Sequence, residues 1–178
     1  MTHTIRIGML AATLVACAGL LAAPVASAGE KVIHTRYAGV GYDTVVDTNG
    51  DGLTVGLTLA DQQGTFGQAQ LAITSEWYVF PRDCRDGYDL PVALVNSVAI
   101  ATFADQSQLF HFSTGGWLCV STTTGAYYGE VYGVYGGGTG RFAEATGTYI
   151  TKFDGQNLDP TIGFRSIRAI SEGRLTTP

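Results

Sequence analysis

Apolar and polar residues alternate with a period of two along most of the chain after residue 29. The segment Leu53–Leu59 (LTVGLTL) is the clearest case, because every second residue in it is apolar. Side chains of a strand point alternately to its two faces, so this alternation predicts a half-buried β-strand. No window in this part of the chain has a convincing helical period. The pattern therefore predicts an all-β protein.

The same pattern predicts roughly eight or nine strands without a fixed-period repeat or a linker between domains. The turn before the Leu53–Leu59 strand, Asn49–Gly52, has the residues that a hairpin turn prefers. Val92–Phe103 is apolar on both faces, as expected where the outer face meets a neighbouring subunit or layer. The further predicted strands are Phe66–Tyr78, Val92–Phe103, Leu109–Phe112, Trp117–Ser121, Tyr127–Tyr135, Thr146–Phe153 and Ile162–Ile170.

The spacing of these strands suits a closed barrel or a sandwich, and two observations favour the barrel. Closure removes the strand edges that otherwise invite pairing between chains. Glycine is also abundant, with 24 among 178 residues. Glycines inside strands mark the bends and close backbone approaches that small barrels need. Those inside predicted strands are Gly56, Gly67, Gly129, Gly133 and Gly147.

The first 28 residues form a predicted signal peptide rather than part of the fold. An apolar run from Met9 to Val25 ends at Ala26-Ser27-Ala28, the small-x-small pattern that signal peptidase accepts. Cleavage there leaves one barrel domain, residues 29–178, which is secreted or periplasmic. A transmembrane anchor is disfavoured by Pro24. The remaining alternative is a lipoprotein anchored through Cys17, although the apolar run continues past this cysteine.

Two cysteines remain after the leader, Cys84 and Cys119, and an exported domain favours a disulfide between them. The leader removes one of ten basic residues and none of fifteen acidic ones, so the mature formal charge is −6. Basic residues form no stripe, which argues against nucleic acid or a membrane surface as a partner once the leader is cleaved.

The segment Gly136–Gly147 (GGGTGRFAEATG) is the most distinctive in the chain. It imitates a dinucleotide-binding fingerprint, which requires a helix after the glycines. The residues that follow, Thr148–Thr151, favour a strand instead. A phosphate-binding P-loop is excluded as well, since Arg141-Phe142 follows Gly140. We therefore interpret Gly137, Gly138, Thr139 and Gly140 as a structural corner between two strands.

This corner resembles the V-x-G-G-T-G-x-[FY]-x-x-A-x-G run of allene oxide cyclases, plant dirigent proteins and their bacterial relatives. Leu57–Gln70 (LTLADQQGTFGQAQ) also resembles that family's strand, D-x-x-G turn and G-x-A-Q strand. The resemblance covers roughly residues 45–153. It implies an eight-stranded antiparallel β-barrel of the allene oxide cyclase, calycin-like type, with an apolar axial pocket and often assembled as a homotrimer.

The resemblance implies that catalysis, where it occurs, works by holding a reactive intermediate so that cyclisation or coupling takes one stereochemical course. Such an enzyme is an isomerase or cyclase that needs no cofactor. Plant dirigent proteins carry an acidic residue in the first strand. The nearest segment here, Ile33-His34-Thr35, has no match for it.

Two charges share strand faces with aromatic residues and are the candidate catalytic residues. Glu130 shares a face with Tyr128 and Tyr132, and Arg168 shares one with Phe164. We expect both charges at the barrel rim. The alternative is a pair buried in the lumen that polarises a ligand, lined by these three aromatic residues.

Metal and hydrolase chemistry find little support. Asp47-x-Asn49-x-Asp51-Gly52 resembles half of a calcium loop, but Thr58 stands where the bidentate carboxylate belongs, so a plain turn is favoured. The mature histidines are His34 and His111, which is too few for a metal cluster. There is no nucleophile, base and orienter set.

The leading hypothesis is thus an exported barrel that holds a small hydrophobic ligand, with or without steering its reaction. The chain's nine tyrosines, eight phenylalanines and two tryptophans all lie beyond the leader, and they suit an apolar pocket with a few polar anchors. The alternative is a structural or interaction protein whose barrel is filled by its own side chains.

Overall fold

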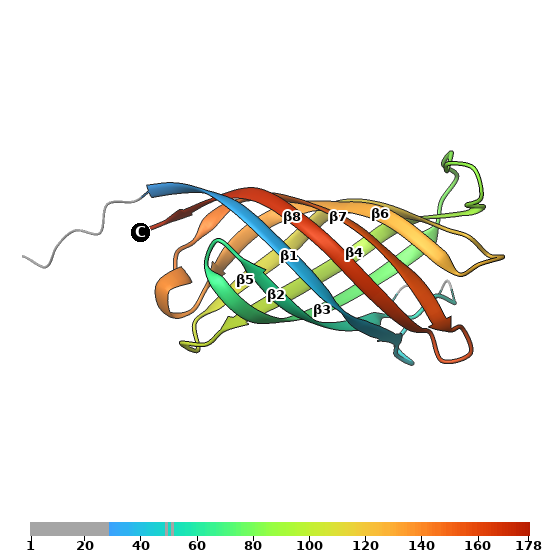
Figure 1. Ribbon diagram of the computed structural model, residues 1–178, viewed down its shortest axis with the longest axis horizontal. Coiled ribbons are helices and arrows are strands. Elements are labelled where there is room, and N and C mark those ends of the chain that lie inside the picture. Colours follow the sequence, from blue (N-terminus) through green and yellow to red (C-terminus); the bar gives the residue numbers. More distant parts are fainter. Residues whose placement is uncertain (1–28, 49, 51) are drawn as a thin grey trace, which may run out of the picture.

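A computed structural model describes residues 29–48, 50 and 52–178, so the predicted signal peptide and Cys17 lie outside the described residues. Eight strands close into one barrel, each antiparallel to the next, and β8 pairs with β1 (Figure 1). The strands are β1 (Gly29–Asp43), β2 (Gly56–Gly64), β3 (Gly67–Val79), β4 (Leu90–Phe103), β5 (Gln108–Val120), β6 (Ala126–Gly138), β7 (Thr146–Asp159) and β8 (Phe164–Thr177).

The predicted eight-stranded antiparallel barrel is therefore confirmed, with two differences in its strands. The pattern does not predict β1, because charged residues and glycines interrupt the apolar positions of Gly29–Asp43. The predicted strands Leu109–Phe112 and Trp117–Ser121 are one strand, β5, whose middle holds the small residues Ser113–Gly116. A register shift between Ser113 and Gly115 keeps this segment in the sheet and moves the inward-facing set by one residue.

The apolar face predicted for Leu53–Leu59 does not point inward. β2 begins only at Gly56, and its buried positions are Gly56, Thr58, Ala60 and Gln62. Leu59 lies on the outer face and is 51% exposed. The alternation predicts a strand correctly, but on β2 the face with Thr58 and Gln62 points into the barrel.

The two ends of the barrel differ. The β2–β3, β4–β5 and β6–β7 connections meet at the end where β1 starts and β8 finishes, on the left of Figure 1. The β6–β7 connection there contains a short 3₁₀ helix, η1 (Gly140–Phe142). The other end carries the long β1–β2 and β3–β4 loops. No helix in the described part of the chain is long and apolar enough to span a membrane.

Aromatic side chains close the first end, which we call the floor. Phe142 of η1 is fully buried, and its ring lies 5.2 Å from that of Phe66 and 5.0 Å from that of Phe103. Ile33 and Leu175 of the neighbouring strands β1 and β8 are buried beside it. Dense packing of this kind fills the barrel at the floor, and we call the opposite end the mouth.

Candidate functional site: the lumen and its mouth

A cavity of about 280 Å³ occupies the barrel interior between the floor and the opposite end. Its lining comes from all eight strands and from Leu53 and Thr54 of the β1–β2 loop. Its volume stands near the lower limit of ligand pockets, roughly 300–1,000 Å³. The barrel is therefore not completely filled by its own side chains.

One wall of the cavity carries hydroxyl and amide groups. It is formed by Thr35 and Tyr37 of β1, Thr58 and Gln62 of β2, Tyr149 and Thr151 of β7, and Ser171 of β8. Thr151 donates a hydrogen bond to Ser171 over 2.9 Å, and the hydroxyls of Ser113 and Tyr149 lie 3.1 Å apart. These side chains are nearly all buried, so only the cavity and one another are within reach.

Three groups of this polar wall have hydrogen-bonding capacity left over. Thr35, Thr58 and Gln62 are buried, and their side chains accept or donate no hydrogen bond within the described residues. The one fully enclosed side-chain polar atom without a partner there is Nε2 of His111. The polar atoms of Thr35, Thr58 and Gln62 therefore reach the cavity, where a ligand or water can form hydrogen bonds with them.

The opposite wall is more apolar, although Ser75, Ser97 and Ser113 add hydroxyl groups to it. Its apolar side chains are those of Leu71, Ile73 and Trp77 of β3, Val92 and Ala99 of β4, and Leu118 and Val120 of β5. The Trp77 ring packs 6.2 Å from that of Phe153 across the lumen, and its Nε1 donates to Ser75 over 3.1 Å. The lumen thus joins a side rich in hydrogen-bonding groups to a more apolar side.

Glycines in the strands make room for the tyrosines of the lumen. A Cβ atom on Gly133 would lie 2.7 Å from the Tyr149 hydroxyl and 2.3 Å from the Phe112 carbonyl oxygen. Both distances are far below van der Waals contact, so only glycine fits beside this ring. Gly133 on β6 therefore determines where Tyr149 of β7 can stand.

The lumen carries almost no charge. Burial raises the pKa of the Tyr127 phenol to about 12 and raises the pKa values of the Tyr37 and Tyr149 phenols as well. All three remain protonated hydroxyls at ordinary pH. Among the described lining residues the only carboxylate and guanidinium are those of Asp43 and Arg165 at the mouth, which pair with each other at 2.5 Å.

His111 of β5 lies deep in the lumen between two aromatic rings. Its imidazole makes edge contacts with Tyr135 at 5.0 Å and Tyr149 at 5.4 Å. Burial lowers the pKa of His111 to about 4, so the side chain is neutral at ordinary pH. It therefore adds no charge to the lumen.

We expect this histidine to make the protein sensitive to acid. The unfolded chain binds a proton on His111 near pH 6.5, whereas the folded protein binds it only near pH 4. Between these values the unfolded state holds more protons, so stability falls as pH falls. Urea denaturation should show about 2–3 kcal/mol less stability at pH 4.5 than at pH 7 from this group. The His111→Leu variant should lose that difference, and equal pH dependence in both proteins would contradict the prediction.

The β1–β2 loop leans over the mouth and is tied to the outside of β3. Glu76 is fully buried beneath it, and its carboxylate accepts hydrogen bonds from the Thr48 backbone N–H at 2.8 Å and from the Thr48 hydroxyl. Asp47 accepts from the N–H groups of Gly50 and Gly52. These bonds place Leu53 and Thr54 against the cavity.

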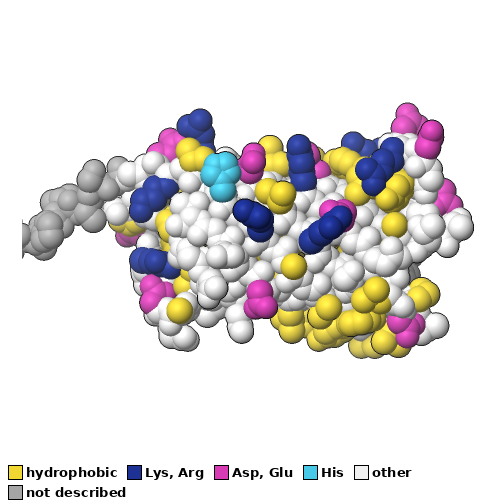
Figure 2. Space-filling view, in the orientation of Figure 1, with side chains coloured by type: hydrophobic (Ala, Val, Ile, Leu, Met, Phe, Trp, Pro, Cys, Tyr) yellow, Lys and Arg dark blue, Asp and Glu magenta, His cyan; other side chains and the backbone are white. Residues whose placement is uncertain are grey.

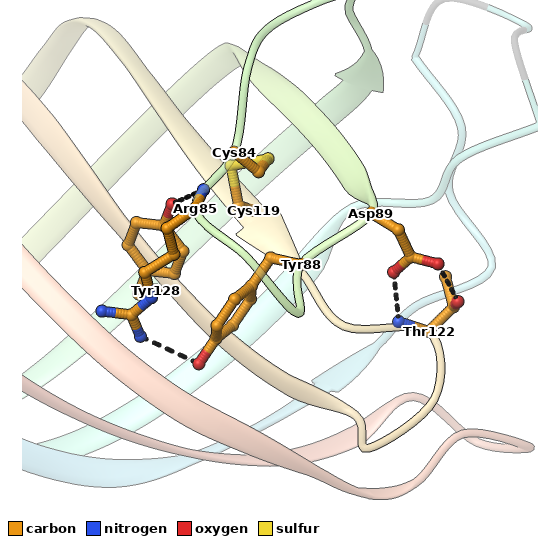
Figure 3. The surroundings of a disulfide bond; sticks show 7 residues. All are labelled: Cys84, Arg85, Tyr88, Asp89, Cys119, Thr122 and Tyr128. Atoms are coloured by element: carbon orange, nitrogen blue, oxygen red, sulfur yellow. Dashed lines mark hydrogen bonds between the residues drawn. A yellow bond between two sulfur atoms is a disulfide. The ribbon is translucent and has the colours of Figure 1, made fainter.

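The β3–β4 loop stands beside the mouth and is held by the disulfide between Cys84 and Cys119 (Figure 3). This bond confirms the predicted pairing. The Asp89 carboxylate accepts from the Thr122 backbone N–H over 2.8 Å and from its hydroxyl. Arg85 donates its backbone N–H to the Tyr128 hydroxyl over 3.0 Å. The loop is thus fastened to both β5 and β6.

The candidate catalytic pair of the sequence analysis is not in the lumen. Arg168 is exposed on the outer face of β8 and pairs with Asp154 at 2.7 Å. Glu130 lies on the outer face of β6, in register with Trp117 and Lys152. The buried-pair alternative for these two charges is therefore wrong. Figure 2 shows charged side chains of both signs over the outer face that β1 and β8 form.

The three aromatic residues expected to line the lumen also point outward. Tyr128 contacts Arg85 and Tyr88 outside the barrel, and Tyr132 is 44% exposed. Phe164 shares the outer register of β8 with Arg168. The inward set is shifted by one residue, since Tyr127 and Val131 of β6 line the cavity together with Ile167 of β8.

The predicted corner lies where β6 passes into η1: Gly137 and Gly138 end β6, Thr139 follows, and Gly140 begins η1. Gly137 and Gly140 have positive φ angles of 84° and 57°, which glycine adopts without strain. The Thr139 hydroxyl accepts a hydrogen bond from the Gln108 backbone N–H over 3.0 Å. The corner thereby carries Phe142 into the floor.

No group of three or more histidine, cysteine or acidic side chains in the described residues could hold a metal ion.

The fold and the site define a class: a small up-and-down β-barrel with a packed floor and a ligand-sized lumen. No protein-family model matches the sequence, and no curated protein matches it. Among solved structures, the pterocarpan synthase dirigent protein GePTS1 is similar at 14% identity, over 82% of this chain and 85% of that chain, with a TM-score of 0.40. This similarity is too low to carry an argument about fold or function.

Proposed function

We propose that this chain is an exported barrel, related to the allene oxide cyclase and dirigent families, that holds one small uncharged molecule in its lumen. The observation that carries the proposal is the cavity of about 280 Å³ above the packed floor. The disulfide supports export, because such bonds persist outside the cytoplasm. The glycine corner supports the family relationship.

The two walls of the lumen indicate the ligand's chemistry. An apolar body would pack against β3, β4 and β5, while hydroxyl or carbonyl groups would meet the polar wall. A charged group would lose its hydration without gaining a partner, which is costly in a buried site. The Asp43–Arg165 pair at the mouth is already neutralised. The proposed ligand is therefore amphipathic and neutral, more polar than a purely hydrophobic molecule.

Trp77 provides a direct assay for this ligand, because it lines the cavity whereas Trp117 lies outside the barrel. In a Trp117→Phe variant the remaining fluorescence comes from Trp77. Titration with neutral aromatic alcohols and ketones should change it saturably. Absence of a saturable change across a broad panel would overturn the proposal.

A pair of neighbouring substitutions separates the lumen from the outer surface in the same assay. Ser97 is buried and lines the cavity, whereas Val98 is its outward neighbour on β4. Ser97→Leu narrows the lumen and should abolish the response, while Val98→Leu should preserve it. Loss of the response in both variants, or in neither, would show that the probe binds elsewhere.

Enzymatic action requires a further result. A rigid lumen that holds a reactive epoxide or phenoxy radical in one pose would favour one stereochemical product. Formation of a single enantiomer in the presence of the protein, from a substrate that gives a racemate without it, would establish an isomerase or a coupling activity. If the ligand binds but the product is racemic, the protein binds the ligand without directing its reaction.

One observation supports the alternative function, that of a structural or interaction protein. Apolar side chains on the outer faces of β2 and β4–β6 are exposed: Leu59, Val98, Ile100, Phe112 and Val134. Val98, Phe112 and Val134 are consecutive cross-strand neighbours. Figure 2 also shows hydrophobic side chains gathering along the lower flank of the barrel. The homotrimer remains a prediction, and light scattering of the purified protein tests it.

A further inference from the structure

An arginine–aromatic cluster stands outside the barrel beside the mouth. We define it by Arg82, Arg85, Tyr88, Trp117 and Tyr128. The three rings touch in a row, with centroids 4.7 Å apart from Tyr88 to Tyr128 and 5.6 Å apart from Tyr128 to Trp117. The two guanidinium groups lie over these rings.

Each guanidinium is held by cation–π stacking. The Arg82 group lies 3.8 Å from the Trp117 ring centroid, and the Arg85 group lies 3.9 Å from that of Tyr128 and 4.6 Å from that of Tyr88. Arg85 also donates from Nη2 to the Tyr88 hydroxyl over 2.9 Å. Stacking fixes the plane of a guanidinium and leaves its N–H edge available.

The loop that carries both arginines is anchored immediately beside them. Cys84 lies between Arg82 and Arg85 and is bonded to Cys119 of β5, which is fully buried. The bonds from Asp89 to Thr122 hold the other end of the loop, as Figure 3 shows. The side chains are therefore ordered before any partner arrives, which lowers the entropy cost of binding.

Neither guanidinium has a carboxylate partner in the described residues. The ion pairs found there use Arg141, Arg165, Arg168, Arg174 and His34. Asp83 and Asp86 belong to the same loop but make no ion pair with the two arginines within 4 Å. Arg82 and Arg85 thus stand apart, on a protein with a negative formal charge, as two exposed guanidiniums held by aromatic rings.

From these contacts we propose that the arginine–aromatic cluster is a binding site for an oxyanion: a carboxylate, sulfate or phosphate group of an external molecule. The planar N–H fork of arginine matches two oxygens of such a group, and the charge strengthens both hydrogen bonds. The site lies on the outer surface and is independent of the lumen and its ligand.

The test uses the full exported protein with Trp77→Phe, so that fluorescence comes from Trp117 beneath Arg82. Sodium sulfate, phosphate and acetate are titrated at constant ionic strength against chloride, followed by heparin and polygalacturonate. We expect a saturable change with at least one oxyanion and tighter binding of the matching polymer. Which ion and polymer bind distinguishes sulfate, phosphate and carboxylate as the source.

Two double variants with the same change in net charge complete the test. Arg82→Ala with Arg85→Ala should weaken binding at least tenfold, because charge-assisted hydrogen bonds are lost. Arg168→Ala with Arg174→Ala breaks two outer ion pairs instead and should leave binding within about twofold. No saturable change, or equal weakening in both variants, would overturn the proposal. Circular dichroism confirms that each variant is folded.

Discussion

Replacing Phe142 with alanine is expected to lower the free energy of unfolding by about 3–5 kcal/mol. The side chain is fully buried in the floor and touches the rings of Phe66 in the β2–β3 turn and Phe103 at the end of β4. These contacts join the β2–β3, β4–β5 and β6–β7 connections at one point. Truncation would leave a hole that the closed barrel cannot easily collapse to fill. Urea denaturation followed by circular dichroism measures the loss.

The matched control for this prediction is Phe112→Ala. Phe112 lies on the outer face of β5 and is 41% exposed, so its truncation removes less buried surface and leaves no enclosed hole. Its effect should be much smaller than that of Phe142→Ala. Similar losses for the two variants would mean that the floor is not a packed part of the core.

Loss of the disulfide between Cys84 and Cys119 is expected to have the next largest effect, about 3–4 kcal/mol. The two cysteines are 35 residues apart, and the bond closes a loop that contains β4 and most of β5. Its removal gives the unfolded chain more conformations, while the closed barrel retains all of its strand pairs. The melting temperature should fall on the order of 10 °C.

Reduction of the wild type measures this effect without changing any side-chain volume. The Cys84→Ala, Cys119→Ala double variant is the control, because its melting temperature should not respond to the reductant. A wild type whose stability is the same with and without reductant would contradict the prediction. It would indicate that the β3–β4 loop is held mainly by its bonds to Tyr128 and Thr122.

The strand content followed from the sequence wherever apolar and polar residues alternate without interruption. The predicted strand Phe66–Tyr78 matches β3 to within one residue at each end, Tyr127–Tyr135 lies within β6, and the cysteine pairing followed from the cysteine count and the predicted export of the chain. β1 was missed because its outward positions carry charges and its inward ones include Thr35 and glycines. Local pattern identifies a strand only where its two faces differ clearly.

The alternation of residues does not predict which face of each strand lines the cavity. In Tyr127–Tyr135 it assigns alternate residues to the two faces of the strand, and both faces carry tyrosines. Tyr128 and Tyr132 are the ligand-lining candidates of the sequence, yet the barrel closes with Tyr127, Val131 and Tyr135 inside. The usual rule that apolar residues point inward fails on β2, where Thr58 and Gln62 face the cavity and Leu59 faces solvent.

The sequence by itself determined that the chain forms an antiparallel all-β fold with glycine corners and one disulfide, since these depend on local periodicity, turn chemistry and cysteine number. Only the tertiary structure decided which face of each strand is the lumen, which end of the barrel the floor fills, and that Arg82 and Arg85 lie over the rings of Trp117 and Tyr128. The physical reason is closure: the direction in which eight strands curl, and the register that joins β8 to β1, are properties of the whole barrel.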